Sequence, residues 1–237
     1  MIETTAARPH LWRHVVLATP DLERVSSELQ AFLQIAPGVR HDMGDILGFR
    51  NEMMMVGTTM LEIVQPTKPD HRLHRWFAEH GGEGGYMLVF QTFDADAFRA
   101  RAEAEKLRLT RDMLFRGQDM IQFDPARFGT HLETYRYSLP NGWWGDPVGR
   151  DYAKSAAASE IVAADIAVAA PPAEIAAQVG RLFEAKVRGT AVSFGDKTVR
   201  FASATAHQGL TGIDLRARTA RLRGREATIG RMRWRLV

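Results

Sequence analysis

The sequence predicts an α+β fold made of two βαβββ modules, followed by a shortened second copy of the pair. Segments that begin at His14 and Met87 share one layout: an apolar strand, an aspartate seven residues on that can cap a helix, and then three short strands. The layout recurs after about 70 residues, which indicates an internal repeat. With 45% hydrophobic and 25% charged residues among 237, the composition is that of an ordinary globular protein.

The first module is expected over about residues 11–66 of a domain that spans 1–140. Residues 11–19 are rich in strand-forming types, and Asp21 can cap a helix over 22–33 that carries apolar residues along one stripe. A Pro-Gly break then precedes three short strands, expected at 45–50, 52–56 and 59–64.

The second module is expected over about residues 84–138, after a linker or short helix at 70–80. It repeats the order of the first module. A strand over 86–93 precedes a helix that Asp94 can cap, and three strands follow near 109–115, 119–123 and 130–137.

A shortened second domain is expected over residues 159–237, after a linker at 141–158 that is rich in turn-forming and small residues. Its strand-helix opening is similar to the first two, whereas the chain after residue 210 has no room for a full helix before the terminal strand. The expected elements are a helix at 173–184 and strands at 161–169, 191–194, 198–202, 210–217 and 232–237.

Charge is distributed unevenly along the chain. Residues 1–150 carry 17 Lys and Arg against 20 Asp and Glu, a balance of −3, and residues 151–237 carry 14 against 8, a balance of +6. Near the C-terminus arginine alternates with Met232, Trp234 and Leu236, which is typical of a half-buried strand with one wet face. Because basic runs interleaved with exposed aromatic residues are missing, we expect no nucleic-acid partner.

The chain has no cysteine, which excludes disulfides, thiolate nucleophiles and cysteine-ligated metal centres. No run of about 20 apolar residues offers a membrane span, and the N-terminus lacks the pattern of a secretory signal. The expected location is cytoplasmic, with no membrane partner.

Alternation along the first strand divides its side chains between two faces. Val15 and Leu17 would pack on the helix, which leaves Trp12, His14 and Val16 on the opposite face. His14 would thus lie on a surface that no predicted helix covers.

Two glutamates stand in the middle of apolar strands at matching places in the two modules. Glu62 would share the face of His14, and Glu133 would share a face with His131 and Tyr135. Ionised carboxylates are rarely buried in such strands unless they are paired or bind a metal. The face therefore predicts a small-molecule site, with further contacts from Gln91 and from an adaptable methionine lining made of Met53, Met55, Met60 and Met87.

Four segments within residues 11–137 carry a family resemblance: LWRHVVLATPDLE, TTMLEIVQP, GEGGYMLVFQTFD and FGTHLETYRY. With them the chain resembles the vicinal oxygen chelate superfamily, which includes glyoxalase I, extradiol dioxygenases, methylmalonyl-CoA epimerase and the fosfomycin and bleomycin resistance proteins. The residues after 159 are similar more weakly.

The resemblance implies a U-shaped, cup-like mixed sheet around a divalent ion, which could be zinc, nickel, manganese, iron or cobalt. In that superfamily the ligands come from the start of the first strand and the middle of the last strand of each module. His14, Glu62 and Glu133 stand at such positions. Met87 departs from the pattern, because it stands where metal-binding members usually carry His or Gln and a thioether is a poor ligand for hard ions.

The function that the resemblance implies is that of a metal-dependent lyase or isomerase. Its substrate would be a small, partly apolar molecule with vicinal oxygens that chelate the ion, and the metal would act as a Lewis acid on a developing enolate. Glu133 or Glu62 would move a proton as general base, with His131 as a fourth ligand or general acid. Substrate contacts are expected from Met53, Met55, Met60, Met87, Gln91 and Tyr135.

Two other functions stay open. Met87 favours a metal-free module that binds or sequesters a hydrophobic molecule, as in bleomycin resistance, whereas the pair Glu62 and Glu133 argues against it. An iron-dependent extradiol-type dioxygenase is the second alternative, but such sites place two histidines and one glutamate on iron, and Met87 removes one of the histidines. The sequence also leaves open whether modules pair within one chain or across a homodimer.

Overall fold

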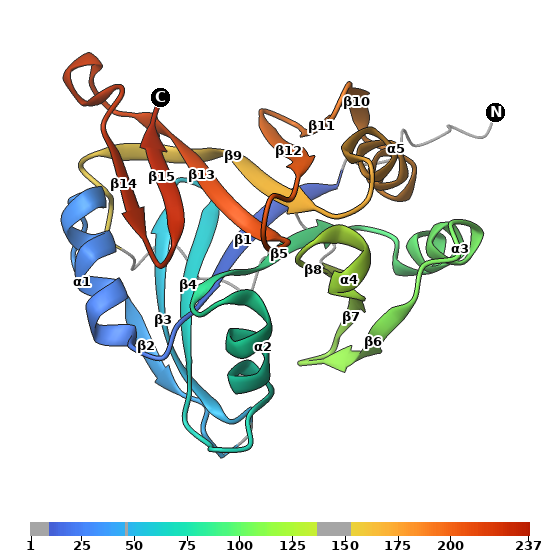
Figure 1. Cartoon of the computed structure of the whole chain (residues 1–237), viewed down its shortest axis with the longest axis horizontal. Helices are drawn as coiled ribbons and strands as arrows, with labels where there is room; N and C mark the ends of the chain where they lie inside the picture. The colour runs from blue at the N-terminus through green and yellow to red at the C-terminus, as the bar shows by residue number, and fades with distance from the viewer. Residues whose placement is uncertain (1–9, 46, 137–152) are drawn as a thin grey trace.

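A computed structural model describes residues 10–45, 47–136 and 153–237 of the chain (Figure 1). Within these residues, fifteen strands join one mixed sheet. The predicted α+β class is confirmed. The predicted linker lies outside the described residues up to position 152.

The first module has the predicted order, with β1 parallel to β4 and the strands arranged β1-β4-β3-β2. Asp21 caps its helix, because the side chain accepts a hydrogen bond from the backbone N–H of Arg24. Gly57 allows the tight turn between the last two strands with φ +64°. The elements are β1 (Leu11–Ala18), α1 (Leu22–Leu33), β2 (Val39–Asp42), β3 (Phe49–Val56) and β4 (Thr59–Pro66).

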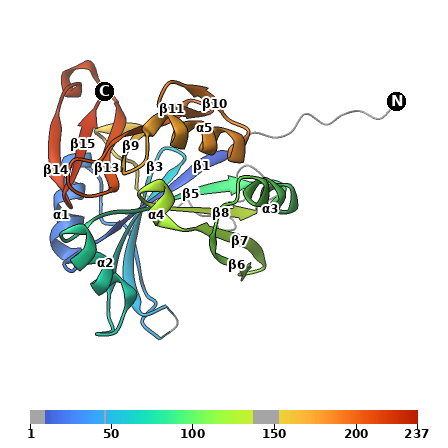
Figure 2. The same ribbon diagram turned by 45° about the vertical axis from the view of Figure 1, so that its right-hand side comes forward.

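The second module repeats this arrangement, with β5 parallel to β8 and the strands arranged β5-β8-β7-β6. Asp94 caps its helix as Asp21 does in the first module. Its elements are β5 (Gly84–Thr92), α3 (Ala95–Ala104), β6 (Leu109–Phe115), β7 (Gln118–Phe123), the short α4 (Pro125–Phe128) and β8 (His131–Arg136). A connecting helix, α2 (Arg72–His80), joins the two modules. Because β1 and β5 pair antiparallel, the two modules form one curved sheet (Figure 2).

The C-terminal half repeats the same connections in shortened form. β9 pairs parallel with β12 and antiparallel with β13, and β13 pairs parallel with β15, as in the first half. A single 3₁₀ turn over 220–222 replaces the last helix. The elements are β9 (Ala158–Val168), α5 (Pro172–Phe183), β10 (Lys186–Arg188), β11 (Ala191–Phe194), β12 (Lys197–Ser203), β13 (Gly209–Ala217), β14 (Glu226–Ile229) and β15 (Met232–Leu236). The predicted division into domains at 140 and 159 remains a proposal.

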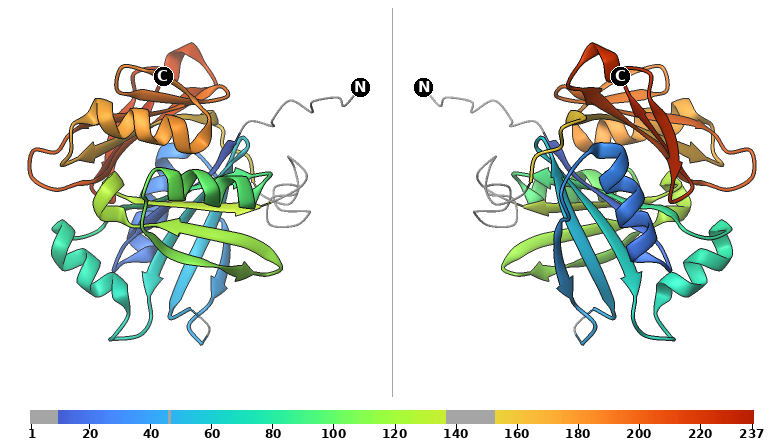
Figure 3. Two further views of the ribbon diagram at one scale, coloured as in Figure 1. Left: turned by 90° about the vertical axis from the view of Figure 1, so that its right-hand side faces the viewer. Right: turned by 90° about the vertical axis from the view of Figure 1, so that its left-hand side faces the viewer.

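The two halves are stacked and share one hydrophobic core (Figure 3). Phe90 of β5 packs against Phe183 of α5 and Phe194 of β11, with ring centroids 4.6 and 4.7 Å away. Trp12 belongs to this core, together with Val15 and Leu17. Its predicted position on the opposite face is wrong, because the register between β1 and β5 shifts between Trp12 and His14 and so reverses the alternation.

A buried polar contact also ties the halves together. The carboxylate of Glu160 on β9 accepts hydrogen bonds from Thr58 and Thr59 in the β3–β4 hairpin. Lys197 of β12 lies 3.2 Å from the same carboxylate and completes the contact. Gly57 allows this close approach, since a Cβ there would meet the Glu160 carboxylate at 2.5 Å.

The first short strand differs from its predicted place at 45–50. The structure has β2 at Val39–Asp42, whose four residues are all exposed. A strand exposed in this way carries no alternation of apolar and polar residues, so its sequence gives no strand signal. None of the helices in the described part of the chain is long and apolar enough to cross a membrane.

Candidate functional site

A cavity of about 1030 Å³ occupies the concave side of the N-terminal half. β1, β3 and β4 contribute residues on one side of it, and β5 to β8 contribute residues on the other. The lining is mostly apolar, as is usual for sites that bind small molecules. Its methionine and phenylalanine side chains are Met43, Met53, Met60, Met87, Met113, Met120, Phe49 and Phe115.

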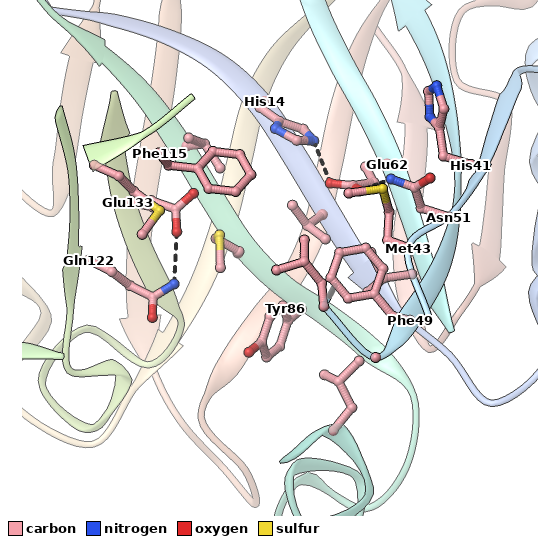
Figure 4. Close-up of a pocket in the computed structure, with 18 of the residues that line it drawn as sticks. His14, His41, Met43, Phe49, Asn51, Glu62, Tyr86, Phe115, Gln122 and Glu133 are labelled. Atoms are coloured by element: carbon pink, nitrogen blue, oxygen red, sulfur yellow. Dashed lines mark hydrogen bonds and ion pairs between the residues drawn. The ribbon is translucent and has the colours of Figure 1, made fainter. Parts of the chain in front are cut away.

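His14 and Glu62 form a buried pair on one side of the cavity (Figure 4). The Nε2 atom of His14 lies 3.1 Å from Oε2 of Glu62, and the two side chains are 3% and 12% exposed. Asn51 of β3 donates a hydrogen bond to the other oxygen of Glu62. The sequence predicted the shared face of His14 and Glu62 but gave no indication of Asn51 as their partner.

The pair is arranged to hold Glu62 as a carboxylate. Burial opposes ionisation, but His14 and Asn51 outweigh it, so the pKa of Glu62 lies below its ordinary value. Glu62 is therefore an acceptor that keeps the His14 ring in place across the neutral pH range.

Glu133 lies on the opposite side of the cavity (Figure 4). Gln122 of β7 stands directly across from it in the β7–β8 ladder and donates a hydrogen bond of 2.8 Å to its Oε2 atom. Burial raises the pKa of Glu133 to about 7, against the weaker lowering effects of Gln122, His14 and Arg72. Both the acid and the carboxylate form are thus populated near neutral pH.

Strand register shows that the two glutamates are equivalent. Val16 stands opposite Glu62 between β1 and β4, and Val89 stands opposite Glu133 between β5 and β8. By the same count Met87 corresponds to His14. The repeat therefore supplies a histidine beside one glutamate and a methionine beside the other.

This donor set does not fit a resident divalent ion. The three expected ligands are His14, Glu62 and Glu133, but the first two bind each other and the third faces them from across the cavity. Met87, at the position equivalent to His14, offers only a thioether, which is a poor ligand for hard divalent ions. Within the described residues no three His, Asp or Glu side chains are grouped to hold a metal.

The structure places seven of the predicted site residues on the cavity and three elsewhere. The residues that line it are His14, Glu62, Glu133, Met53, Met60, Met87 and Tyr135, of which the first three were also predicted as ligands or catalytic groups. Met55, Gln91 and His131 do not line it.

These three side chains have other surroundings. Met55 packs beside the apolar lining without reaching the cavity. Gln91 is fully buried and accepts a hydrogen bond of 3.1 Å from Arg13. His131 lies behind Tyr86, with ring centroids 4.8 Å apart. A register shift leaves Tyr86 unpaired between Val16 and Leu17, and its ring lines the cavity.

Several lining residues were not predicted from the sequence. Asn51 and Gln122 are two residues from Met53 and Met120 along their strands, so alternation places them on the same faces. That spacing is the signal from which they could have been found. Arg72 and Arg111 lie at the cavity as well.

The matching surface of the C-terminal half is occupied by ion pairs. Asp165 of β9 binds Arg200 and Arg233, and Asp214 of β13 binds these two arginines and also Arg235. Burial opposes the ionisation of Asp214, but the arginines outweigh it and lower its pKa. Arg233 and Arg235 of β15 are thus partners for the buried Asp214, and Arg233 also for the half-buried Asp165.

Comparison with known proteins agrees with this architecture. Residues 12–183 match the family described as a glyoxalase-like domain. A hypothetical protein from Staphylococcus aureus shares the fold, with 11% identity, a TM-score of 0.71, and coverage of 96% of this chain and 99% of that one. Methylmalonyl-CoA epimerase from Mycobacterium tuberculosis is similar over 59% of this chain and 94% of its own, with 18% identity and a TM-score of 0.47.

None of the proteins with a curated description matches the chain. The family match covers both modules of the N-terminal half and continues through β9 and α5. The chain therefore belongs to the glyoxalase-like domain family, within the vicinal oxygen chelate superfamily.

Proposed function

We propose that this protein is an isomerase or lyase that moves a proton on a small, partly apolar molecule bound in the N-terminal cavity. The observation that carries the proposal is the placement of two equivalent carboxylates on opposite sides of one apolar cavity. One of them, Glu62, is paired with His14, and the other, Glu133, has an uncharged partner in Gln122.

The two sides suit complementary proton-transfer roles. Environments that push the pKa values of two acids apart are typical of sites that need one acid and one base. Glu133 would take the proton from a carbon next to a carbonyl group, since its pKa of about 7 matches the pH at which it would work. Burial among apolar residues raises the pKa of Glu133 and so makes its carboxylate a stronger base without an added cofactor.

His14 would act from the opposite face of the bound molecule. Glu62 orients the imidazole ring and supplies a partner for a proton on it, as a carboxylate does behind a catalytic histidine. Return of a proton by His14 to the opposite face of the carbon would invert its configuration. Delivery of the proton to a departing group would complete an elimination instead.

Proton exchange tests the proposal. The purified protein is incubated in heavy water with a panel of racemic 2-aryl and 2-alkyl ketones and thioesters, and deuterium uptake is followed by mass spectrometry. We expect uptake at the carbon next to the carbonyl group of at least one compound. The Glu133→Gln variant should slow it by about 100-fold or more, because it keeps the shape of the side chain but loses the base.

Glu103→Gln is the matched control, because Glu103 is exposed on α3 and lies outside the cavity. It should exchange at the wild-type rate. Compounds that bind should raise the melting temperature of the protein. If none of these takes up deuterium with either the wild-type protein or the Glu103→Gln variant, the proposal is contradicted.

That outcome would favour a second function, a metal-free binding protein. The observation in its favour is the cavity itself, which is large, mostly apolar and rich in methionine. A binding protein would hold its ligand equally well in the Glu133→Gln and wild-type forms.

A further inference from the structure

We propose that the ligand of the N-terminal cavity carries an anionic group, a carboxylate or a phosphate, which Arg72 and Arg111 bind at the mouth. The inference rests on the proposed function for the identity of the site, and it adds the chemical class of the molecule. Its observations are the positions and partners of the two arginines.

Arg72 is the first residue of α2 and lines the cavity although its side chain is exposed. Its guanidinium group lies over the ring of Tyr86, 5.9 Å from the centroid. Tyr86 is itself a lining residue, so the guanidinium group of Arg72 lies at the solvent-exposed edge of the cavity.

Arg111 reaches the cavity from the second module. It lies on β6 with Met113 and Phe115, which alternate toward the cavity on the same strand. In the β6–β7 ladder it stands opposite Gln122, the partner of Glu133. Arg72 therefore reaches the cavity from α2, and Arg111 reaches it from β6.

Neither arginine has an acidic partner among the described residues, although other arginines on the same elements or nearby do. On the outer side of the β6–β7 hairpin, Arg99 binds Asp112 and Asp119 at 2.8 and 2.7 Å. On α2, Arg75 lies 3.5 Å from Glu79. The unpaired charges are thus found where the side chains face the cavity.

Lys68 and Asp70 also line the cavity and are exposed, and their charges are opposite. The cationic character of the mouth therefore comes from Arg72 and Arg111. Glu62 and Glu133 belong to the interior and have partners of their own. An apolar interior below a cationic rim matches a molecule with an apolar body and one anionic end.

Guanidinium groups suit this role because their planar donors match the oxygens of carboxylates and phosphates. Burial raises the pKa of Glu133, and the charge of Arg72 is one of the effects that oppose it. The anionic end would therefore lie close enough to influence the reacting carboxyl group.

Two fluorescent probes with the same aromatic body test the inference without requiring catalysis. Anilinonaphthalene sulfonate carries an anionic group, and N-phenylnaphthylamine is its uncharged counterpart. We expect the wild-type protein to bind the sulfonate about tenfold or more tightly than the amine. Arg72→Gln and Arg111→Gln should each remove most of that preference and leave the affinity for the amine unchanged.

Arg75→Gln is the control, because it removes the same charge from an exposed site on α2 that does not line the cavity. Displacement of the bound probe by naphthoate or by naphthyl phosphate then decides which anion is preferred. Equal affinities for the two probes, a preference that survives in both arginine variants, or no binding of either probe would overturn the inference. Deuterium exchange by the wild-type protein in those cases would leave the proposed function standing.

Discussion

Glu62 and Glu133 occupy equivalent positions in β4 and β8, but only Glu62 lies beside a histidine. The difference comes from the first strand of each module, where His14 corresponds to Met87. The pKa of Glu62, which lies beside His14, is lowered, whereas burial raises the pKa of Glu133 on the other side.

The raised pKa of Glu133 predicts a specific dependence of stability on pH. Its pKa is about 7 in the folded protein and 4.5 by the ordinary value, so folding favours the protonated form. The resulting stabilisation is complete below pH 4.5 and is lost as the pH rises to about 7. Relative to Glu133→Gln, the wild-type free energy of unfolding should fall by about 3 kcal/mol over that range.

Urea unfolding of both proteins at a series of pH values measures this difference. Carbon-13 shifts of labelled glutamate side chains give the pKa of Glu133 directly. A flat difference between the two proteins, or a titration near pH 4.5, would show that the carboxyl group is not held in an apolar environment.

Removal of His14 should destabilise the protein. His14→Ala leaves the buried Glu62 carboxylate with Asn51 as its remaining partner, and breaking a buried pair costs about 3 kcal/mol. The pKa of Glu62 should rise at the same time. Because its lowered pKa contributes stability that is lost as the pH falls, the wild-type protein should lose its advantage over His14→Ala in acid.

Thermal unfolding of the two proteins between neutral and acidic pH checks the effect of His14. His74→Ala is a suitable control, because His74 is exposed on α2. An unchanged melting temperature in His14→Ala would mean that the contact with Glu62 contributes no stability.

Met87→His should convert the cavity into a metal site. The variant places a second histidine at the position equivalent to His14, next to Glu133. We expect the pKa of Glu133 to fall by about one unit or more and zinc to bind with one equivalent per chain. The wild-type protein should hold less than one equivalent, because Met87 offers a thioether where the variant offers an imidazole.

Elemental analysis and calorimetric zinc titration distinguish the two forms. One equivalent of metal in the wild-type protein, lost in Glu62→Ala and Glu133→Ala, would restore the ligand set expected from the sequence. In that case the proton-transfer roles assigned to the two glutamates would have to be withdrawn.

Lys197→Met should weaken the connection between the two halves. Lys197 is 4% exposed and lies 3.2 Å from Glu160, so its loss leaves a buried carboxylate without its cation. We expect a cost of about 3 kcal/mol in the free energy of unfolding. The double variant Lys197→Met with Glu160→Gln should lose less than the sum of the two single variants, because the residues are coupled.

The repeat, the order of its elements and most of the cavity face could be predicted from the sequence. Strand alternation placed Val15 and Leu17 in the core and Glu62 and Glu133 on the concave side, because regular strands follow a period of two. The aspartate caps were equally visible, since Asp21 and Asp94 each precede an amphipathic helix.

Irregularities within the strands could not be predicted. Register shifts in the β1–β5 ladder moved Trp12 into the core and brought Tyr86 to the cavity. Such a shift reverses the alternation without changing the local composition, so the sequence carries no sign of it. Alternation could have placed Asn51 and Gln122 on the cavity face, but the glutamate that each one binds depends on the register between strands, which the pattern along a single strand does not reveal.

The arginines that fill the concave surface of the C-terminal half have a consequence for stoichiometry. Arg200, Arg233 and Arg235 form ion pairs with Asp165 and Asp214. A second ligand molecule would have to break these ion pairs in order to bind in the C-terminal half. We therefore expect the chain to bind one equivalent of ligand, in the N-terminal cavity, although it contains four related modules. We expect the C-terminal half to support the fold through the shared core without binding a ligand of its own.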